Sequence, residues 1–272
     1  MIKDRAAIVG IGQTAFAKSL PGSELEMACQ AIKAALDDAA VDPAEVDGLA
    51  SFTMEQAFVE QEVARNLGLG DITFFSQIGY GGGAGCAAVG HAAMAVATGQ
   101  ATVAVACVIV PAERAPDHPR TPVFIHAFAQ GLNRQHQTMT NYHNEDPLMG
   151  PGWACSQALW RNADFGPEDV EVAQIYDAFS PLIPLSLEAY GFCKRGEGAP
   201  FTGDGNIEWP GGRLPVNTSG GGMSEAYVHG FNLVAEGVRQ LRGTSTAQVD
   251  GAQTCLVTSG EGVPTSALLL RR

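Results

Sequence analysis

The sequence is poor in charged residues, and basic residues are the scarcest. Only 17% of its 272 residues are charged, and 16 Lys and Arg stand against 29 Asp and Glu, which gives a formal net charge of −13. Nucleic-acid-binding proteins need clustered basic side chains to neutralise phosphates, so this balance argues against that class. With 46% hydrophobic residues the chain can still bury a core, which excludes a mostly disordered protein.

Long apolar runs and export signals are also missing. The most apolar stretches, residues 87–97 and 101–111, are shorter than the roughly 18 residues that suggest a membrane-spanning helix. Lys3 and Arg5 precede only a short apolar run, unlike the start of a secretory signal peptide. The six cysteines show no Cys-x-x-Cys spacing, so we expect reduced thiols and no metal site. We therefore expect a cytoplasmic protein without a membrane span.

Apolar strands alternate with helix-like segments, and the order of features occurs twice. Residues 6–12 have the pattern of a buried strand that ends in glycine, and a segment with apolar side chains at helical spacing follows. This alternation predicts an α/β fold with a largely parallel sheet. Glycine triplets at residues 81–83 and 220–222 each precede a helix and then an apolar strand. Two similar halves, residues 1–131 and 132–272, explain this repetition better than chance does.

The glycine loops favour an oxyanion site. Glycine lets backbone N–H groups approach a ligand closely. The sequence has neither the Gly-Lys-Ser/Thr end of a phosphate-binding loop nor the third glycine of a dinucleotide-binding loop. The remaining possibility is a site whose N–H groups stabilise negative charge that develops on a carbonyl oxygen. The candidate residues are Gly82, Gly83, Gly221, Gly260 and Gly262.

The segment at residues 216–221, Val-Asn-Thr-Ser-Gly-Gly, and the final Gly-x-Gly strand resemble the thiolase superfamily over nearly the whole chain. The resemblance implies duplicated mixed-sheet halves in α/β/α/β/α layers, a homodimer, and a place for Asn217 in the substrate-binding site. Thiolases also carry a large loop domain after the strand that matches residues 101–105. That domain is apparently missing here near residues 105–106, so we expect a break within residues 101–110 rather than one continuous strand.

Other residue types occupy the catalytic positions of the thiolase pattern. The position of the nucleophilic cysteine falls near Gly82, and Cys86 lies about one helical turn further on. Tyr176 and Tyr227 stand where thiolases have two histidines, and Thr258 stands where they have a second cysteine. An acyl-enzyme needs a thiolate and a base that activates it, so we do not expect thiolase chemistry.

Two phenols in place of two imidazoles are similar to the lipid-transfer-protein-type aldolases of steroid side-chain degradation. The resemblance implies retro-aldol cleavage of a steroid β-hydroxyacyl-CoA to a ring ketone and propionyl-CoA, with coenzyme A as part of the substrate and no other cofactor. Such a cleavage needs a base, an acid and an oxyanion site. We assign Tyr176 as the base and Tyr227 as the proton donor, or the reverse, and His229 as a third candidate catalytic residue.

The acidic chain has few basic residues for the phosphates of coenzyme A, so we expect the nucleotide to be held elsewhere. The resemblance suggests a separate acyl-CoA-binding partner with an OB-fold and a zinc ribbon. Two alternatives remain open. One is a thiolase-type acyltransferase with Cys86 as its nucleophile, and the other is a non-catalytic scaffold subunit. Tyr176 could also be a core aromatic residue, and His229 a structural one.

Overall fold

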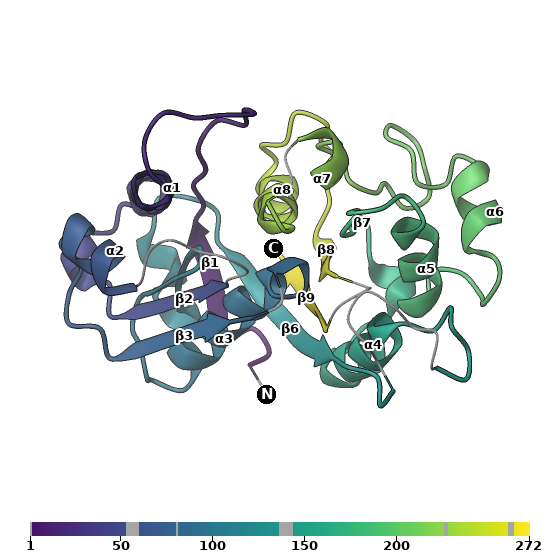
Figure 1. The fold of residues 1–272 in the computed structure, drawn as a ribbon, viewed down its shortest axis with the longest axis horizontal. Coiled ribbons are helices and arrows are strands. Elements are labelled where there is room, and N and C mark those ends of the chain that lie inside the picture. Colours follow the sequence, from purple (N-terminus) through teal and green to yellow (C-terminus); the bar gives the residue numbers. More distant parts are fainter. Residues whose placement is uncertain (1, 53–59, 80, 136–143, 226–227, 261–263) are drawn as a thin grey trace.

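The structure, a computed structural model, describes residues 2–52, 60–79, 81–135, 144–225, 228–260 and 264–272. Within these ranges the strands form one sheet with helices on both of its sides (Figure 1). The strands are β1 (Ala6–Gly10), β2 (Gly48–Phe52), β3 (Phe74–Ile78), β4 (Ala104–Val105), β5 (Val108–Pro111), β6 (Val123–Gly131), β7 (Val172–Gln174), β8 (Thr254–Ser259) and β9 (Thr265–Arg271). The α-helices are α1 (Glu24–Ala39), α2 (Glu60–Leu67), α3 (Gly85–Ala97), α4 (Pro151–Asn162), α5 (Leu182–Ala189), α6 (Gly198–Gly203), α7 (Gly221–Ser224) and α8 (Phe231–Arg242).

The sheet is mixed, in the order β3-β2-β4-β5-β1-β6-β9-β8-β7. Among the named strands, β2 pairs in parallel with β3 and β4, and β7 with β8. The pairs between these outer groups are antiparallel. The prediction of a largely parallel sheet is therefore wrong for the centre of the sheet. A parallel connection needs a crossover helix, and no helix stands between β4 and β5 or between β8 and β9. The mixed sheet of the thiolase resemblance is confirmed.

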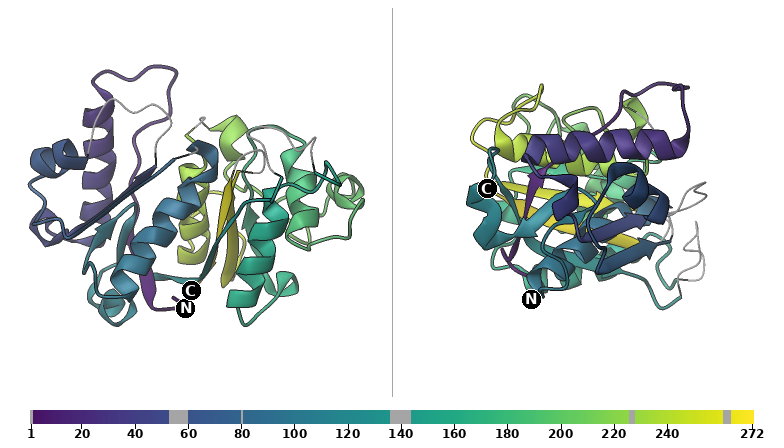
Figure 2. Two further views of the ribbon diagram at one scale, coloured as in Figure 1. Left: turned by 60° about the horizontal axis from the view of Figure 1, so that its bottom comes forward. Right: turned by 90° about the vertical axis from the view of Figure 1, so that its left-hand side faces the viewer.

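The layers follow from the alternation of side chains along the strands. On β1, Ile8 lies in a central core and Val9 in an outer core beneath α1. On β9, Leu268 lies in the same central core and Leu269 in a second outer core beneath α4 and α5. The central core contains α3 and α8, which lie between the two halves of the sheet (Figure 2, left). The sequence-based expectation of α/β/α/β/α layers is confirmed.

The expected break in the apolar run is present. β4 ends at Val105, the chain turns at Ala106 and Cys107, and β5 returns antiparallel with Val108 opposite Val105. The run therefore forms a tight hairpin between β4 and β5.

The repeated sequence features occupy similar places in the fold. The segment after α1 forms a 3-10 turn at Pro43–Glu45 and leads into β2, and the segment after α4 forms one at Pro167–Asp169 and leads into β7. The division into halves at residues 131 and 132 stays a prediction. In the part of the chain that the structure describes, no helix has the length and apolar character needed to cross a membrane.

Candidate functional site

Tyr176 is the second residue after the end of β7, and its backbone is held from two sides. Its N–H donates to Thr258 Oγ1 on β8 at 3.1 Å. The preceding residue, Ile175, donates its N–H to Asn217 Oδ1 at 2.7 Å and accepts from Asn217 Nδ2 at 2.9 Å. Asn217 has a positive φ of 52° and lies in a turn whose side-chain amide supports the end of β7. These contacts fix the position from which the Tyr176 side chain projects.

The phenol of Tyr176 fills the space beside Gly82. A Cβ atom built on Gly82 would lie 2.3 Å from the Tyr176 hydroxyl oxygen and 2.6 Å from its ring carbon Cζ. On its other side the ring lies 3.1 Å from the Cβ position of Gly230. Real Cβ atoms do not come as close to other atoms as the 2.3 and 2.6 Å at Gly82, because the van der Waals repulsion is too large. A side chain at position 82 and a phenol at position 176 therefore exclude each other. That the thiolase nucleophile corresponds to a position near Gly82 stays a prediction.

His229 is the polar partner of this phenol. The Tyr176 hydroxyl lies 3.4 Å from His229 Nδ1, and which of the two donates depends on the imidazole tautomer. His229 has a positive φ of 53°, an uncommon conformation for a residue with a side chain and one that is often found at functional sites. Its ring makes a T-shaped contact with Phe52, with the ring centroids 6.1 Å apart. Burial lowers the pKa of His229 below the ordinary value of a histidine.

The glycine turn before α3 is tied to the C-terminal strands. Ser266 Oγ donates to the carbonyl of Gly83 at 2.7 Å, and Cys86 N–H donates to Ser259 Oγ at 2.9 Å. Gly260 follows β8 directly after Ser259, so the end of β8 and the start of α3 lie side by side. Sequence reasoning did not identify the two serines as parts of the site, because each contacts a residue more than 170 positions away in the chain.

The second glycine triplet is built around Asp177. Gly222 N–H donates to Asp177 Oδ1 at 2.8 Å, and Met223 N–H lies 3.4 Å from Oδ2. A Cβ on Gly221 would lie 2.2 Å from Asp177 Oδ2, so only glycine fits there. These N–H groups are engaged within the protein, as is the amide of Asn217. Oxyanion binding by Asn217 and Gly221 stays a prediction, and their observed contacts support the residues on either side of Tyr176.

The structure thus brings Tyr176, His229 and Gly82 together, and Gly83 and Gly260 belong to the loops that border them. Tyr227 and Gly262 lie outside the described residues. Among the residues that the structure describes, no group of three or more His, Cys, Asp or Glu could hold a metal ion.

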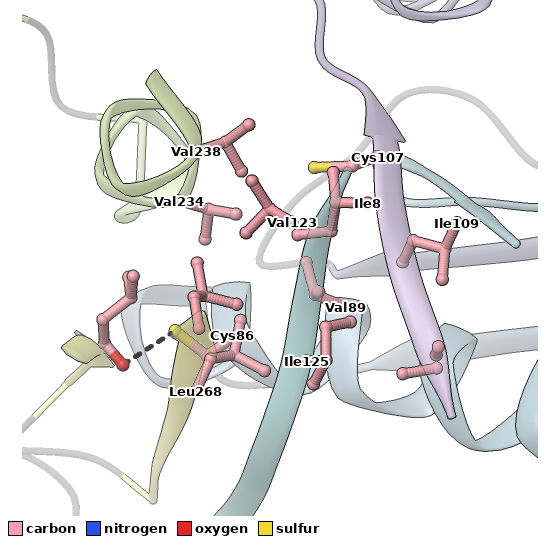
Figure 3. Close-up of a cluster of buried hydrophobic side chains, with 14 of the residues drawn as sticks. Ile8, Cys86, Val89, Cys107, Ile109, Val123, Ile125, Val234, Val238 and Leu268 are labelled. Atoms are coloured by element: carbon pink, nitrogen blue, oxygen red, sulfur yellow. Dashed lines mark hydrogen bonds between the residues drawn. The ribbon is translucent and has the colours of Figure 1, made fainter. Parts of the chain in front are cut away.

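Cys86 is unsuited to act as a nucleophile. It is fully buried in the central core, where it packs close to Val89 and Leu268 (Figure 3). Its thiol lies 3.6 Å from the carbonyl oxygen of Val257, and burial raises the pKa of the thiol to about 12. A thiol with this pKa is protonated near neutral pH, whereas the attacking species is the thiolate. The geometry therefore disfavours an acyl-enzyme at Cys86.

Family models assign both halves of the chain. Residues 6–119 match the N-terminal domain of thiolase, and residues 133–270 match the thiolase C-terminal domain-like family. A solved structure described as a monomeric SCP2-thiolase-like protein type 1 from Mycobacterium smegmatis has a TM-score of 0.71 with this chain, covers 98% of it and 77% of its own length, and is 16% identical. At that identity the likeness concerns the fold alone.

More similar proteins are aldolases. The 17-hydroxy-3-oxo-4-pregnene-20-carboxyl-CoA lyase of Mycobacterium tuberculosis is 36% identical, and the alignment covers 99% of this chain and 100% of that protein. It runs over 390 positions, more than the 272 residues of this chain, so parts of that relative have no counterpart here. The steroid side-chain-cleaving aldolase of Thermomonospora curvata is 34% identical, with 97% of each chain covered.

A solved structure agrees with these relatives. The structure described as the Ltp2-ChsH2(DUF35) aldolase has a TM-score of 0.95 and 34% identity, with 99% of this chain and 98% of that chain covered. The chain therefore belongs to the thiolase superfamily and, within it, to the branch of thiolase-fold aldolases, which are carbon–carbon lyases.

Proposed function

We propose that this aldolase cleaves a steroid β-hydroxyacyl-CoA by a retro-aldol reaction, with a ring ketone and propionyl-CoA as products. The observation that carries the proposal is the phenol of Tyr176 in the space beside Gly82, with a histidine in reach of its hydroxyl. This arrangement leaves no room for a nucleophile at position 82 and provides a group for proton transfer. The names of the relatives that match over nearly the whole chain support the substrate class.

The reaction needs three contributions. A base removes the proton of the β-hydroxyl group, the bond between the α- and β-carbons breaks, and its electrons form the enolate of the thioester. We assign the first step to Tyr176, with His229 accepting the phenol proton through Nδ1 as the substrate proton arrives. Tyr227 then protonates the α-carbon, or the two tyrosines exchange roles. The loops at Gly82, Gly83 and Gly260 supply N–H groups to the thioester oxygen.

Coenzyme A carries phosphates, and this acidic chain has few cationic side chains near the site loops to bind them. Arg195, one of the few basic residues near the second half's loops, is engaged by Asp146 and by Glu188, with N–O distances of 3.2 and 3.1 Å. We therefore propose that a DUF35-type partner, with an OB-fold and a zinc ribbon, holds the nucleotide, in line with the partner named in the related solved structure. The chain itself contributes the thioester end of the site.

A second copy of the chain also forms part of the proposed assembly. β3 is an edge strand of the sheet, and its Phe75 side chain is 73% exposed. An uncovered edge strand with an exposed aromatic side chain favours pairing with another strand. We propose a homodimer through this edge, and light scattering that gives a monomer mass would count against it.

We also propose a cytoplasmic location, because all six cysteines are free thiols, as is usual in a reducing compartment.

The proposed function is tested by identifying the products. The purified chain, with and without its DUF35-type partner, is incubated with a steroid β-hydroxyacyl-CoA, and the mixture is analysed by mass spectrometry. A ring ketone and propionyl-CoA in equal amounts support the proposal. An acyl group attached to the protein, or a product that retains the bond between the α- and β-carbons, would refute it.

Replacing Cys86 with Ala separates aldolase from acyltransferase chemistry. We expect the Cys86→Ala variant to keep most of its turnover, because the buried, protonated thiol takes no part in the proposed reaction. Cys29→Ala, at a half-buried position on α1, is the matched control. If Cys86→Ala loses turnover while its thermal unfolding is unchanged, Cys86 is the nucleophile.

The pH dependence of turnover reports on His229. The neutral imidazole accepts a proton and the charged one does not, and burial lowers the pKa of this residue from about 6.5. We therefore expect kcat/KM to stay constant through pH 6.5 and to fall only at more acidic pH, as His229 becomes protonated. The His229→Gln variant should have a low rate and lack this acidic limb. An identical limb in that variant would assign the titration to another group.

A further inference from the structure

Glu225 lies a few residues before His229, and its carboxylate contacts the chain on both sides of the His229 turn. Its Oε2 accepts a hydrogen bond from Ser219 Oγ at 3.0 Å and another from Asn232 Nδ2 at 2.7 Å. Ser219 directly precedes the second glycine triplet, and Asn232 is the second residue of α8. A single carboxylate oxygen therefore links the segment before the turn to the helix after it.

The two partners of Glu225 belong to firmly held parts of the fold. Asn232 is 4% exposed, and α8 is buried from there to Val238. Ser219 follows the turn of Asn217, whose side-chain amide is hydrogen-bonded to the backbone after β7. Hydrogen bonds to a carboxylate are stronger than those between neutral groups. Glu225 is therefore tied to two fixed points of the structure.

The turn that lies between these points has an unusual backbone. His229 and Gly230 both have positive φ, 53° and 84°. For a residue with a side chain this conformation persists only where the surrounding structure holds it. It places His229 Nδ1 3.4 Å from the Tyr176 hydroxyl and brings Gly230 against the Tyr176 ring. A small shift at either end of the turn would therefore move the imidazole relative to the phenol.

We propose that Glu225 is a positioning residue for the reaction at Tyr176. By holding Ser219 and Asn232 together, its carboxylate keeps the His229 turn in its left-handed conformation and the imidazole within reach of the phenol. In this role Glu225 acts through His229 rather than on the substrate. The inference rests on the proton-transfer role proposed above for Tyr176 and His229.

The kinetic test compares two replacements of Glu225. Glu225→Ala removes both hydrogen bonds and should lower kcat about 10²-fold, because small displacements of a catalytic group have effects of this size. Glu225→Gln retains an acceptor oxygen and should recover most of this loss. Glu113→Ala, at an exposed position in the 3-10 turn after β5, is the control and should keep the wild-type kcat. If Glu225→Gln is as slow as Glu225→Ala, the hydrogen bonds do not carry the effect and the proposal is overturned.

The titration of His229 in the chain without substrate provides a readout that a loss of stability alone would not change. The imidazole contacts the phenol of Tyr176 and the uncharged ring of Phe52, and burial lowers its pKa. If Glu225→Ala releases the turn, water reaches the imidazole and its pKa should rise toward about 6.5. Removing a nearby negative charge would by itself lower the pKa of a histidine, so a rise reports a change of position.

NMR of the full chain labelled with ¹³C at the histidine Cε1 atoms measures this pKa, and the His229→Gln variant assigns the resonance. Glu225→Gln should retain the wild-type titration. An unchanged or lower pKa of His229 in folded Glu225→Ala would overturn the proposal. Circular dichroism of each variant shows whether it is folded.

Ser219→Ala tests the proposal even if Glu225→Ala does not fold. This replacement, at a half-buried position, removes one of the two hydrogen bonds and leaves the carboxylate with Asn232. We expect a smaller rise in the pKa of His229, and no rise would count against the positioning role. Because the NMR titration needs no turnover, it is independent of the product analysis. A chain that releases no propionyl-CoA would refute the proposed function, whereas a rise in the pKa would still assign the placement of His229 to Glu225.

Discussion

Replacing Tyr176 with Phe is expected to lower kcat by about 10²- to 10⁴-fold, the usual contribution of one group in general acid–base catalysis. The substitution removes the hydroxyl that lies 3.4 Å from His229 and leaves the ring in its place between the positions of Gly82 and Gly230. KM should change little, because the shape of the site is retained. Steady-state kinetics with the purified complex measures both constants.

Tyr190→Phe is the matched control for this experiment. Tyr190 is 1% exposed and lies in the outer core beneath α4 and α5, so its replacement also removes one buried phenol. We expect it to leave kcat unchanged. Should Tyr176→Phe and Tyr227→Phe both turn over at the wild-type rate, the chain would be a scaffold subunit and the chemistry would belong to its partner.

Adding a single methyl group at position 82 should also lower kcat strongly. In Gly82→Ala the new Cβ would lie 2.3 Å from the Tyr176 hydroxyl, so the phenol must move away from His229 or the glycine turn must shift. We expect a loss of kcat of about 10²-fold or more, since small displacements of a catalytic group have effects of this size. Gly82→Cys should behave in the same way and should not gain thiolase activity.

Gly79→Ala is the control for this substitution. A Cβ at Gly79 meets nothing within 4 Å, so we expect wild-type kinetics. The combined variant, Gly82→Ala with Tyr176→Phe, gives a second test. If the methyl group acts by displacing the phenol, it should lower kcat little further once the hydroxyl is gone, because changes at residues in contact are not additive. Fully additive losses would mean that Gly82 acts independently of Tyr176.

The sequence allowed the layers and the break near residues 105–106 to be predicted, because both depend on local pattern or on a motif, whereas oxyanion binding at Gly82 stays a prediction. Tyr176 and His229 were both named as candidates, and they lie within reach of each other. What the sequence alone could not provide was their mutual geometry, which depends on the turn that gives His229 its positive φ.

The supporting contacts of the site were missed for a physical reason. Ser259 accepts a hydrogen bond from Cys86 at the start of α3, 173 residues away in the sequence. Asp177 accepts one from Gly222, in a loop 45 residues away. Such contacts arise only when distant strands come together, and a serine or an aspartate near a strand end has no distinctive local pattern. Asn217 illustrates the opposite case, since its motif is recognisable but its amide is engaged with the backbone of Ile175.

The hairpin between β4 and β5 is a place where this fold can accept an inserted segment. Its ends, Val105 and Val108, face each other in adjacent strands, so a polypeptide could leave and re-enter there with its two ends already close together. The entropic penalty of closing a loop rises only slowly with loop length. Even a folded domain inserted at this point would therefore destabilise the pairing of β4 with β5 only modestly.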